Sequence, residues 1–331
     1  MSGNNFSIPF GVDESRAAPT PAKDKKIWAI GGGKGGVGKS FIISNLGISL
    51  ARSGKRVVMV DLDLGGANLH TCLGSDIPLH TLSDFFSGRE RRLEYLLNPS
   101  CVPNLFFLSG ANDSVSVADM KEDGHRQLAA ALLNLKTDYL FLDLGAGTHN
   151  TTLDYYLMAN RPLIGITPEP TSIENAYRFI KGAYFRWIKT LEARMGMQSI
   201  VEQAMDHKNT LGIRTPSDLV NKLVEFNPEK GRAFKAEVEK FQIYLIMNQV
   251  RTQNDVEVGH SVRLVCKKYF GIETHYVGYL DYDNAVWQSV RKRRPLVLEY
   301  PYSNLVTEIA QIAKTLDDYE RYPRPNILRV A

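Results

Sequence analysis

The sequence predicts an α/β fold in which a doubly wound, mostly parallel sheet is flanked by helices. Short segments that are apolar throughout alternate with longer segments of helical periodicity, as expected of strands covered on both faces. A glycine-rich stretch, residues 31–38, joins the first such strand to the first helix. The chain has 331 residues, 44% of them hydrophobic and 23% charged, which suits one large domain with an insertion.

Each element is assigned from its own pattern. Apolar runs of strand length occupy residues 26–32, 55–63, 104–110, 138–147, 161–170, 241–250 and 274–283. Helical patterns occupy residues 40–54, 91–98, 124–136, 171–191, the stretch between the last two strands, and 303–319. Gly54 closes the first helix, because glycine is favoured just past a helix end. Such alternation predicts parallel strands joined by covering helices.

Three regions lie outside this alternation. Residues from about 190 to 238 carry many charges and no clear strand pattern, so we expect a helical insertion between two sheet strands. Residues 1–24 are polar and rich in Pro, Ser and Gly, and we expect a flexible tail there. Residues 321–331 are expected to form a second tail, which leaves residues 25–320 as the folded domain.

Composition limits the classes of function. A formal net charge of +4 permits contact with nucleic acid or anionic lipid without indicating either. The three cysteines, Cys72, Cys101 and Cys266, form no C-x-x-C unit, which argues against a zinc site or a disulfide framework. No apolar run reaches the length of a membrane span, and the start of the chain lacks a signal-peptide pattern. A cytoplasmic location is therefore expected.

The glycine-rich stretch carries the strongest motif. Residues 33–40 match the pattern G-x-x-x-x-G-K-[ST] between a predicted strand and a predicted helix. Glycines allow backbone N–H groups to wrap closely round phosphate oxygens, and the helix adds its positive end. Lys39 can neutralise the β- and γ-phosphates, and the Ser40 hydroxyl can bind Mg²⁺. The expected nucleotide-binding residues of this loop are Gly33, Lys34, Gly35, Gly36, Val37, Gly38, Lys39, Ser40 and, through its backbone N–H, Phe41.

Lys34 is a second lysine, placed at the entrance of this loop. A simple phosphate-binding loop does not require a charge there, and Lys34 cannot easily reach the phosphates that Lys39 serves. It is either a cation offered to the nucleotide of a facing subunit, as an arginine finger would be, or a solvated loop lysine. Chemistry alone leaves both interpretations open.

Carboxylates follow two of the predicted strands. Asp61 and Asp63 come at the end of one strand, and Asp143 ends another. The carboxyl ends of parallel strands face the ligand crevice, so these groups are candidates for Mg²⁺ chemistry. Asp143 has the placement from which an acid reaches Mg²⁺ through water. A turn at a strand end would also explain Asp61 or Asp63.

These motifs resemble those of a known superfamily. The segment KGGVGKS, residues 34–40, resembles the deviant Walker A motif of the MinD/ParA superfamily of P-loop ATPases. Residues 61–70 are similar to a stretch of MinD and FlhG/FleN proteins and lack the ParA pattern. Residues 138–147, 167–181 and 277–297 look most similar to FlhG/FleN, which regulate flagellar number and placement. The resemblance covers nearly all of the predicted domain except the insertion.

The resemblance implies roles for single residues. It implies an ATP-sandwiched homodimer in which Lys34 reaches the partner's nucleotide, so Lys34, Lys39 and Asp63 are the expected catalytic residues. Asp63 would help to order the attacking water, and Asn248 would bind adenine. Ser40, Asp63 and Asp143 are then the expected metal-binding residues, with ATP and Mg²⁺ as cofactors.

The sequence departs from the family at three places. Phe41 stands where many relatives carry a second hydroxyl residue. Residues 280–283 read Leu-Asp-Tyr-Asp, without the family's proline, which puts the adenine-side contacts of that loop in doubt. The basic amphipathic membrane helix that ends MinD and many FlhG proteins is not visible.

The expected function is that of a dimerising ATPase that regulates the position or number of a cellular structure. ATP would drive binding to an unidentified protein partner, and slow hydrolysis would release it. The alternative is a ParA-type ATPase that binds nonspecific DNA through Arg291–Arg294. That short basic run lacks interleaved aromatic residues, which favours a solvated or partner-facing stretch instead. Unpaired cysteines disfavour an iron–sulfur carrier, and the residues after Asp63 disfavour a bacterial tyrosine kinase.

Overall fold

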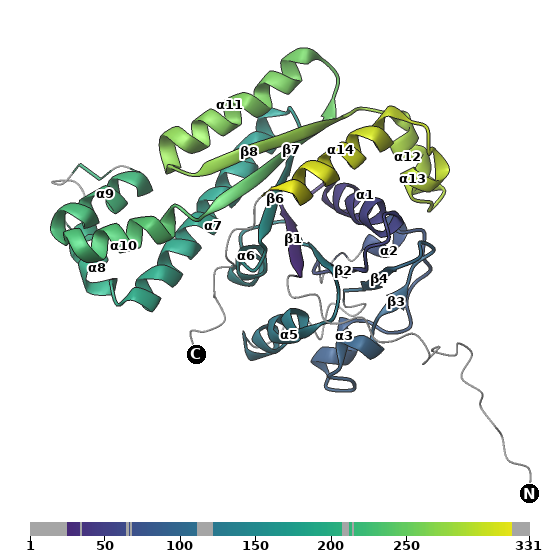
Figure 1. Cartoon of the computed structure of the whole chain (residues 1–331), viewed down its shortest axis with the longest axis horizontal. Helices are drawn as coiled ribbons and strands as arrows, with labels where there is room; N and C mark the ends of the chain where they lie inside the picture. The colour runs from purple at the N-terminus through teal and green to yellow at the C-terminus, as the bar shows by residue number, and fades with distance from the viewer. Residues whose placement is uncertain are drawn as a thin grey trace, which may run out of the picture.

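A computed structural model of the chain describes residues 25–319, apart from residues 34, 64, 65, 67, 111–121, 207–211 and 214. The expected tails and Lys34 lie outside the described residues. Figure 1 shows a central sheet with helices packed on both of its faces.

The sheet confirms the predicted fold class. Its eight strands lie in the order β3-β4-β2-β5-β1-β6-β7-β8. All neighbouring strands are parallel except β3 and β4. The strands are β1 (Lys26–Gly31), β2 (Val57–Asp61), β3 (Asn98–Pro99), β4 (Leu105–Leu108), β5 (Tyr139–Asp143), β6 (Arg161–Ile166), β7 (Gln242–Val250) and β8 (Glu273–Asp281).

The helices divide between the two faces because successive strand residues point to opposite sides. Ile27 and Ala29 belong to one core cluster, and Trp28 and Ile30 belong to the other. Helices α5 (Glu122–Asn134), α6 (Asn150–Leu157), α7 (Pro170–Met195) and α11 (Gln253–Phe270) bury side chains in the first cluster. The second cluster is covered by α1 (Lys39–Arg52), α2 (Leu69–Cys72), α13 (Leu296–Glu299) and α14 (Asn304–Asp318).

Several short elements were not expected from the sequence. They are β3, α2, α3 (Leu82–Phe86), α6, α12 (Asn284–Arg291) and α13. The helix predicted at residues 91–98 is wrong: only Leu93–Tyr95 form a 3₁₀ turn, and Asn98 begins β3. The remaining predicted strands and helices lie where expected, with ends that differ by a few residues.

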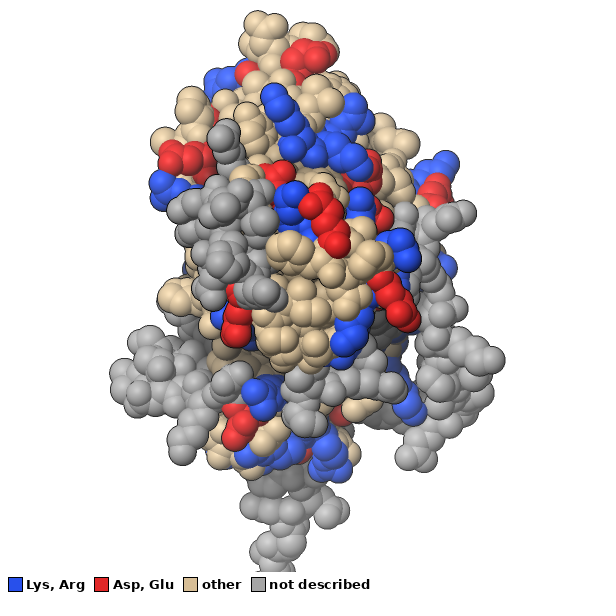
Figure 2. Space-filling view, turned by 90° about the vertical axis from the view of Figure 1, so that its left-hand side faces the viewer, with Lys and Arg blue, Asp and Glu red and all other residues tan. Residues whose placement is uncertain are grey.

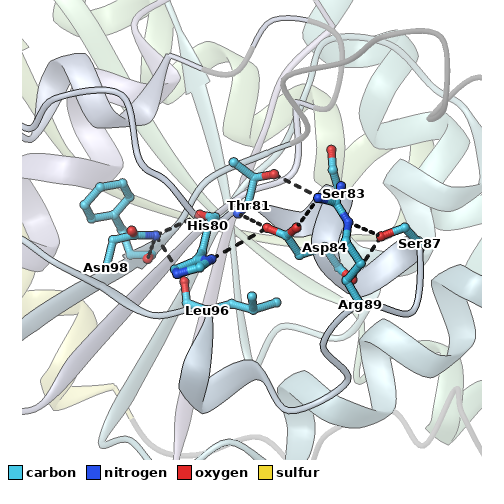
Figure 3. Close-up of polar contacts among 9 residues, drawn as sticks. His80, Thr81, Ser83, Asp84, Ser87, Arg89, Leu96 and Asn98 are labelled. Atoms are coloured by element: carbon cyan, nitrogen blue, oxygen red, sulfur yellow. Dashed lines mark hydrogen bonds and ion pairs between the residues drawn. The ribbon is translucent and has the colours of Figure 1, made fainter. Parts of the chain in front are cut away.

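Side-chain hydrogen bonds fix the edge of the sheet at β3 (Figure 3). Thr81 caps α3, because its hydroxyl accepts from the Ser83 N–H and the Asp84 carboxylate accepts from the Thr81 N–H. The Asn98 amide donates to the carbonyls of His80 and Leu96. The loop before α3 is therefore tied to the edge strand.

Three helices occupy the segment between α7 and β7. They are α8 (Gln198–Asp206), α9 (Pro216–Phe226) and α10 (Pro228–Val238). Leu223 and Phe234 are fully buried and share a core with Trp187 and Leu191 of α7. Figure 2 shows the side of the molecule that these helices occupy, with acidic and basic side chains interspersed over it. Among the described helices, none has the length and apolarity that a membrane crossing requires.

Candidate functional site

The glycine-rich loop lies at the centre of the sheet, where the strand order reverses. Strand β1 ends at Gly31 between β5 and β6, and α1 begins at Lys39. Crevices at such switch points are the usual ligand sites of open α/β sheets. Gly38 caps α1 with φ of 89° and makes no side-chain cap hydrogen bond. The first N–H groups of α1 therefore have no side-chain acceptor at the cap and can serve an anion.

The loop packs closely against α7 and the end of β7, which explains two of its glycines. A Cβ added at Gly33 would lie 2.0 Å from the backbone oxygen of Asn175 in α7. A Cβ added at Gly38 would lie 2.4 Å from Nδ2 of Asn248. Gly35 and Gly36 have no atom within 4 Å of an added Cβ, so their side faces open space. The loop is thus closely packed at Gly33 and Gly38 and open at Gly35 and Gly36.

Lys39, Ser40 and Asp143 form a polar cluster where α1 begins and β5 ends. Lys39 is 9% exposed and Asp143 is 3% exposed. The Ser40 hydroxyl and the Lys39 ammonium lie close to the Asp143 carboxyl group. Burial, followed by the charge of Asp61, raises the pKa of Asp143 to about 7. Its Oδ1 atom is buried and has no hydrogen-bond partner among the described residues.

Asp61 and Asp63 occupy different positions although they are two residues apart. Asp61 pairs in register with Asp143 and is 1% exposed. Its carboxylate accepts from the N–H groups of Asp63 at 3.1 Å and Leu69 at 2.9 Å. Burial raises the pKa of Asp61 to about 6. The Asp63 carboxylate instead lies beside Gly145, 3.2 Å from an added Cβ. Asp61 is therefore a brace for the loop after β2, and Asp63 is the more exposed carboxylate.

Asn248 reaches the loop from a bulge at the end of β7. The register with β8 shifts after Met247, and Gln249 has φ of 61°, an uncommon conformation for a residue with a Cβ. Asn248 donates from Nδ2 to the Val37 carbonyl at 2.9 Å, and its Oδ1 accepts from the Gln249 N–H at 3.0 Å. The structure thus gives Asn248 a bracing role that the sequence did not suggest. Its contact with adenine stays a prediction.

The remaining expected residues lie on or next to the loop. Val37 is 4% exposed and Phe41 is 7% exposed, so both anchor the loop in the core. Lys34 lies outside the described residues, so its role stays a prediction. Asn175 was missed by sequence reasoning, and nothing in the sequence pointed to it, because it supports Gly33 through its backbone.

The residues present fit a magnesium-bound nucleoside triphosphate. Amide groups at the start of α1 and the Lys39 ammonium suit phosphate oxygens. The unpartnered Asp143 oxygen, the Ser40 hydroxyl and the Asp63 carboxylate are hard oxygen donors, which Mg²⁺ prefers. The described residues contain no cluster of three His, Cys, Asp or Glu side chains of the kind that would bind a metal alone.

Comparisons with known proteins also indicate a nucleotide-binding domain. Residues 28–296 match the family model for the CobQ/CobB/MinD/ParA nucleotide binding domain. The antiactivator FleN of Pseudomonas aeruginosa is 28% identical over 295 residues, which cover 89% of this chain and 87% of FleN.

Solved structures show the same fold. MinD of Pyrococcus horikoshii, complexed with Mg-ADP, superposes with a TM-score of 0.59 at 20% identity, covering 89% of this chain and 97% of MinD. A ParA family ATPase of Chlorobium tepidum gives a TM-score of 0.59 at 16% identity, covering 88% and 98%. At these identities the likeness establishes the architecture alone.

Proposed function

The chain belongs to the CobQ/CobB/MinD/ParA nucleotide-binding family, and from this premise we propose that it is a Mg²⁺-dependent ATPase whose ATP-bound form dimerises. The observation that carries the proposal is the loop of residues 33–40, wedged at the switch point of the sheet with Lys39 and Ser40 beside buried Asp143. The MinD and ParA members of this family are P-loop ATPases. Hydrolysis by this chain in particular is part of the proposal.

Each polar residue has a task in this proposal. Backbone N–H groups of the loop bind the phosphates, and Lys39 neutralises the charge that develops in phosphoryl transfer. Asp63 orients the attacking water, since its carboxylate is the more exposed of the two after β2. Ser40, Asp63 and Asp143 would hold Mg²⁺, which would neutralise negative charge on the phosphates. Asn248 contacts adenine while it braces Val37, and Lys34 completes the site from the facing subunit.

The biological output is a switch in partner binding. The ATP-bound dimer holds a protein partner, and hydrolysis releases it, so that the chain regulates the position or number of a cellular structure. Support comes from the kind of relatives it has: FleN is named an antiactivator, and one solved relative is a MinC:MinD complex. A flagellar structure is the target that the FleN likeness favours.

Two substitutions test this function. We expect Asp63→Ala to bind ATP but to release phosphate at least about 100-fold more slowly, because water positioning is lost. We expect Lys34→Ala to stay monomeric with ATP and to be inactive. Phosphate release and solution mass are the measurements. A Lys34→Ala chain that hydrolyses ATP as a monomer contradicts the role of Lys34 across the dimer.

A further inference from the structure

Helix α12 presents an exposed aromatic and basic surface that the nucleotide site does not use. We call Trp287, Val290 and Arg291–Arg294 the α12 surface. Trp287 is 62% exposed and Val290 is 40% exposed. Trp287 and Arg291 share one exposed stripe of α12, four residues apart. Figure 1 shows α12 and α13 together at one edge of the molecule, beyond the start of α14.

The cations of this surface are only partly neutralised. The Arg291 guanidinium lies over the Trp287 ring at 5.2 Å. Lys292 and Arg294 both pair with Glu299, at 2.7 and 3.1 Å. Arg291 and Arg293 form no ion pair with a carboxylate of the described residues. The surface therefore combines a large exposed aromatic ring with unneutralised guanidinium groups. The linear sequence hides this combination, because Trp287 precedes the basic run by four residues.

A short chain of contacts joins the α12 surface to the nucleotide site. Gly74 follows α2, and a Cβ added there would lie 2.8 Å from the Arg293 carbonyl oxygen and 3.0 Å from Pro295. At its other end, α2 begins at Leu69, whose N–H donates to the Asp61 carboxylate. Asp61 in turn pairs in register with Asp143. These contacts form a continuous path from Asp143 through Asp61 and α2 to the backbone of Arg293.

His70 lies in α2, between the loop after β2 and Arg293, and one of its ring nitrogens lacks a hydrogen-bond partner among the described residues. Its Nδ1 atom is buried and has no hydrogen-bond partner among the described residues. Burial, and after it the Arg293 charge, lower the pKa of His70. The interface between α2 and the basic run is thus close enough for the Arg293 charge to reach His70, and it contains an unpaired polar atom.

We propose that the α12 surface binds an acidic polypeptide segment with an apolar anchor, and that the nucleotide at residues 33–40 sets the affinity. Trp and Arg are the side chains most often found at the energetic centres of protein interfaces. Electrostatic binding of nucleic acid needs several free cations along a backbone, whereas this surface offers two beside one ring. The inference rests on the proposed function, since it names the chemistry of the partner that ATP controls.

Fluorescence anisotropy tests the proposal on the full chain. The probe is a fluorescein-labelled peptide of about 20 residues in which Asp and Glu alternate with Leu and Phe. We expect saturable binding with the ATP analogue AMP-PNP and Mg²⁺, and binding at least about threefold weaker with ADP. We expect Trp287→Ala and Arg291→Glu each to weaken binding about tenfold. The matched controls Tyr269→Ala and Arg232→Glu, on exposed parts of α11 and α10, should change it by less than about twofold.

Other outcomes overturn the proposal. The wild-type chain could fail to bind the peptide, or could bind equally well a peptide with Lys in place of every Asp and Glu. Either result would refute an acidic partner. Tighter binding of duplex or single-stranded DNA that Arg291→Glu abolishes assigns the surface to nucleic acid. Loss of the AMP-PNP dimer in Trp287→Ala assigns it to a second copy of the chain.

The nucleotide link is tested separately from the peptide. Equal peptide affinity with AMP-PNP and ADP refutes the coupling through α2. Binding of a fluorescent ATP analogue, measured on the same samples, should be unchanged in Trp287→Ala and Arg291→Glu. If the wild-type chain fails to bind that analogue, the proposed ATPase function fails, whatever the peptide result.

Discussion

At the scale of single residues, Asn248 packs against Gly38 and hydrogen-bonds to Val37, so it holds the glycine-rich loop in shape. We expect Gly38→Ala to destabilise the protein by about 2 kcal/mol or more, because an alanine there is strained by its positive φ and its Cβ meets the Asn248 amide. Gly35→Ala is the matched control, since its Cβ would meet open space, and it should cost less than about 0.5 kcal/mol. Urea unfolding measures both. Equal costs would show that the brace is not important.

The buried carboxylates predict a pH dependence of the nucleotide-free protein. Burial raises the pKa of Asp143 to about 7, so the folded state holds this proton more tightly than the unfolded state does. Its stabilising effect is present at low pH and is lost as pH rises through about 7. The Asp143→Asn variant has no carboxyl group at this position, so it should not lose this stability as pH rises. Relative to that variant, we expect the wild type to lose on the order of 2 kcal/mol between about pH 5 and pH 8.

Chemical denaturation at the two pH values, without Mg²⁺ or nucleotide, measures this difference. The Asp143→Asn variant is compared with Asp318→Asn, a carboxylate at the end of α14, which should track the wild type at both values. A gap between wild type and Asp143→Asn that is the same at both pH values would contradict the raised pKa.

At the scale of elements, long regular patterns were predictable and short ones were not. The seven parallel strands and the helices of three or more turns follow from apolar runs and helical periodicity. The two-residue β3 and the four-residue α2 are too short to show a period, so their positions depend on tertiary contacts such as those of Asn98 and Gly74.

The same limit applies to the site. Its motif residues could be picked out because the motif has a fixed spacing between a strand and a helix, and their roles in phosphate binding stay predictions. The support given by Asn175 was not predictable, since it is made by backbone. The amide of Asn248 meets Val37 because of a bulge in β7, and a bulge leaves little trace in one sequence. The surroundings of Arg291–Arg294 were likewise visible only in three dimensions.

The end of α14 is tied to β6 by a buried guanidinium. Arg161 is 2% exposed and donates to the Leu316 carbonyl at 3.1 Å and to the Tyr319 carbonyl. We expect Arg161→Met to destabilise the protein by about 3 kcal/mol, because carbonyls at the helix end lose their donor. ATP affinity should change less than about twofold, since Arg161 begins β6 and the proposed nucleotide site lies past the other end of that strand. Thermal unfolding and ATP titration are the measurements; weakened ATP binding would contradict this separation.

At the scale of the whole molecule, α8–α10 share a continuous core with the nucleotide-binding sheet. Phe234 of α10 and Trp187 of α7 are buried in the same cluster as Ile243 of β7. We therefore expect a single unfolding transition that includes these helices, and a cost of about 3–5 kcal/mol for Phe234→Ala. Calorimetry checks the number of transitions. A separate early transition that Phe234→Ala alone shifts would show that α8–α10 form an independent unit.

The most direct test of the whole account is calorimetric titration of ATP with Mg²⁺ into the wild-type chain and into Lys39→Ala. The account predicts one nucleotide bound per chain, and affinity at least about 100-fold weaker in Lys39→Ala, because a charge-assisted contact with phosphate is lost. Lys314→Ala, an exposed lysine of α14, should bind as the wild type does. Absence of ATP binding by the wild type, or unchanged binding by Lys39→Ala, would contradict the account.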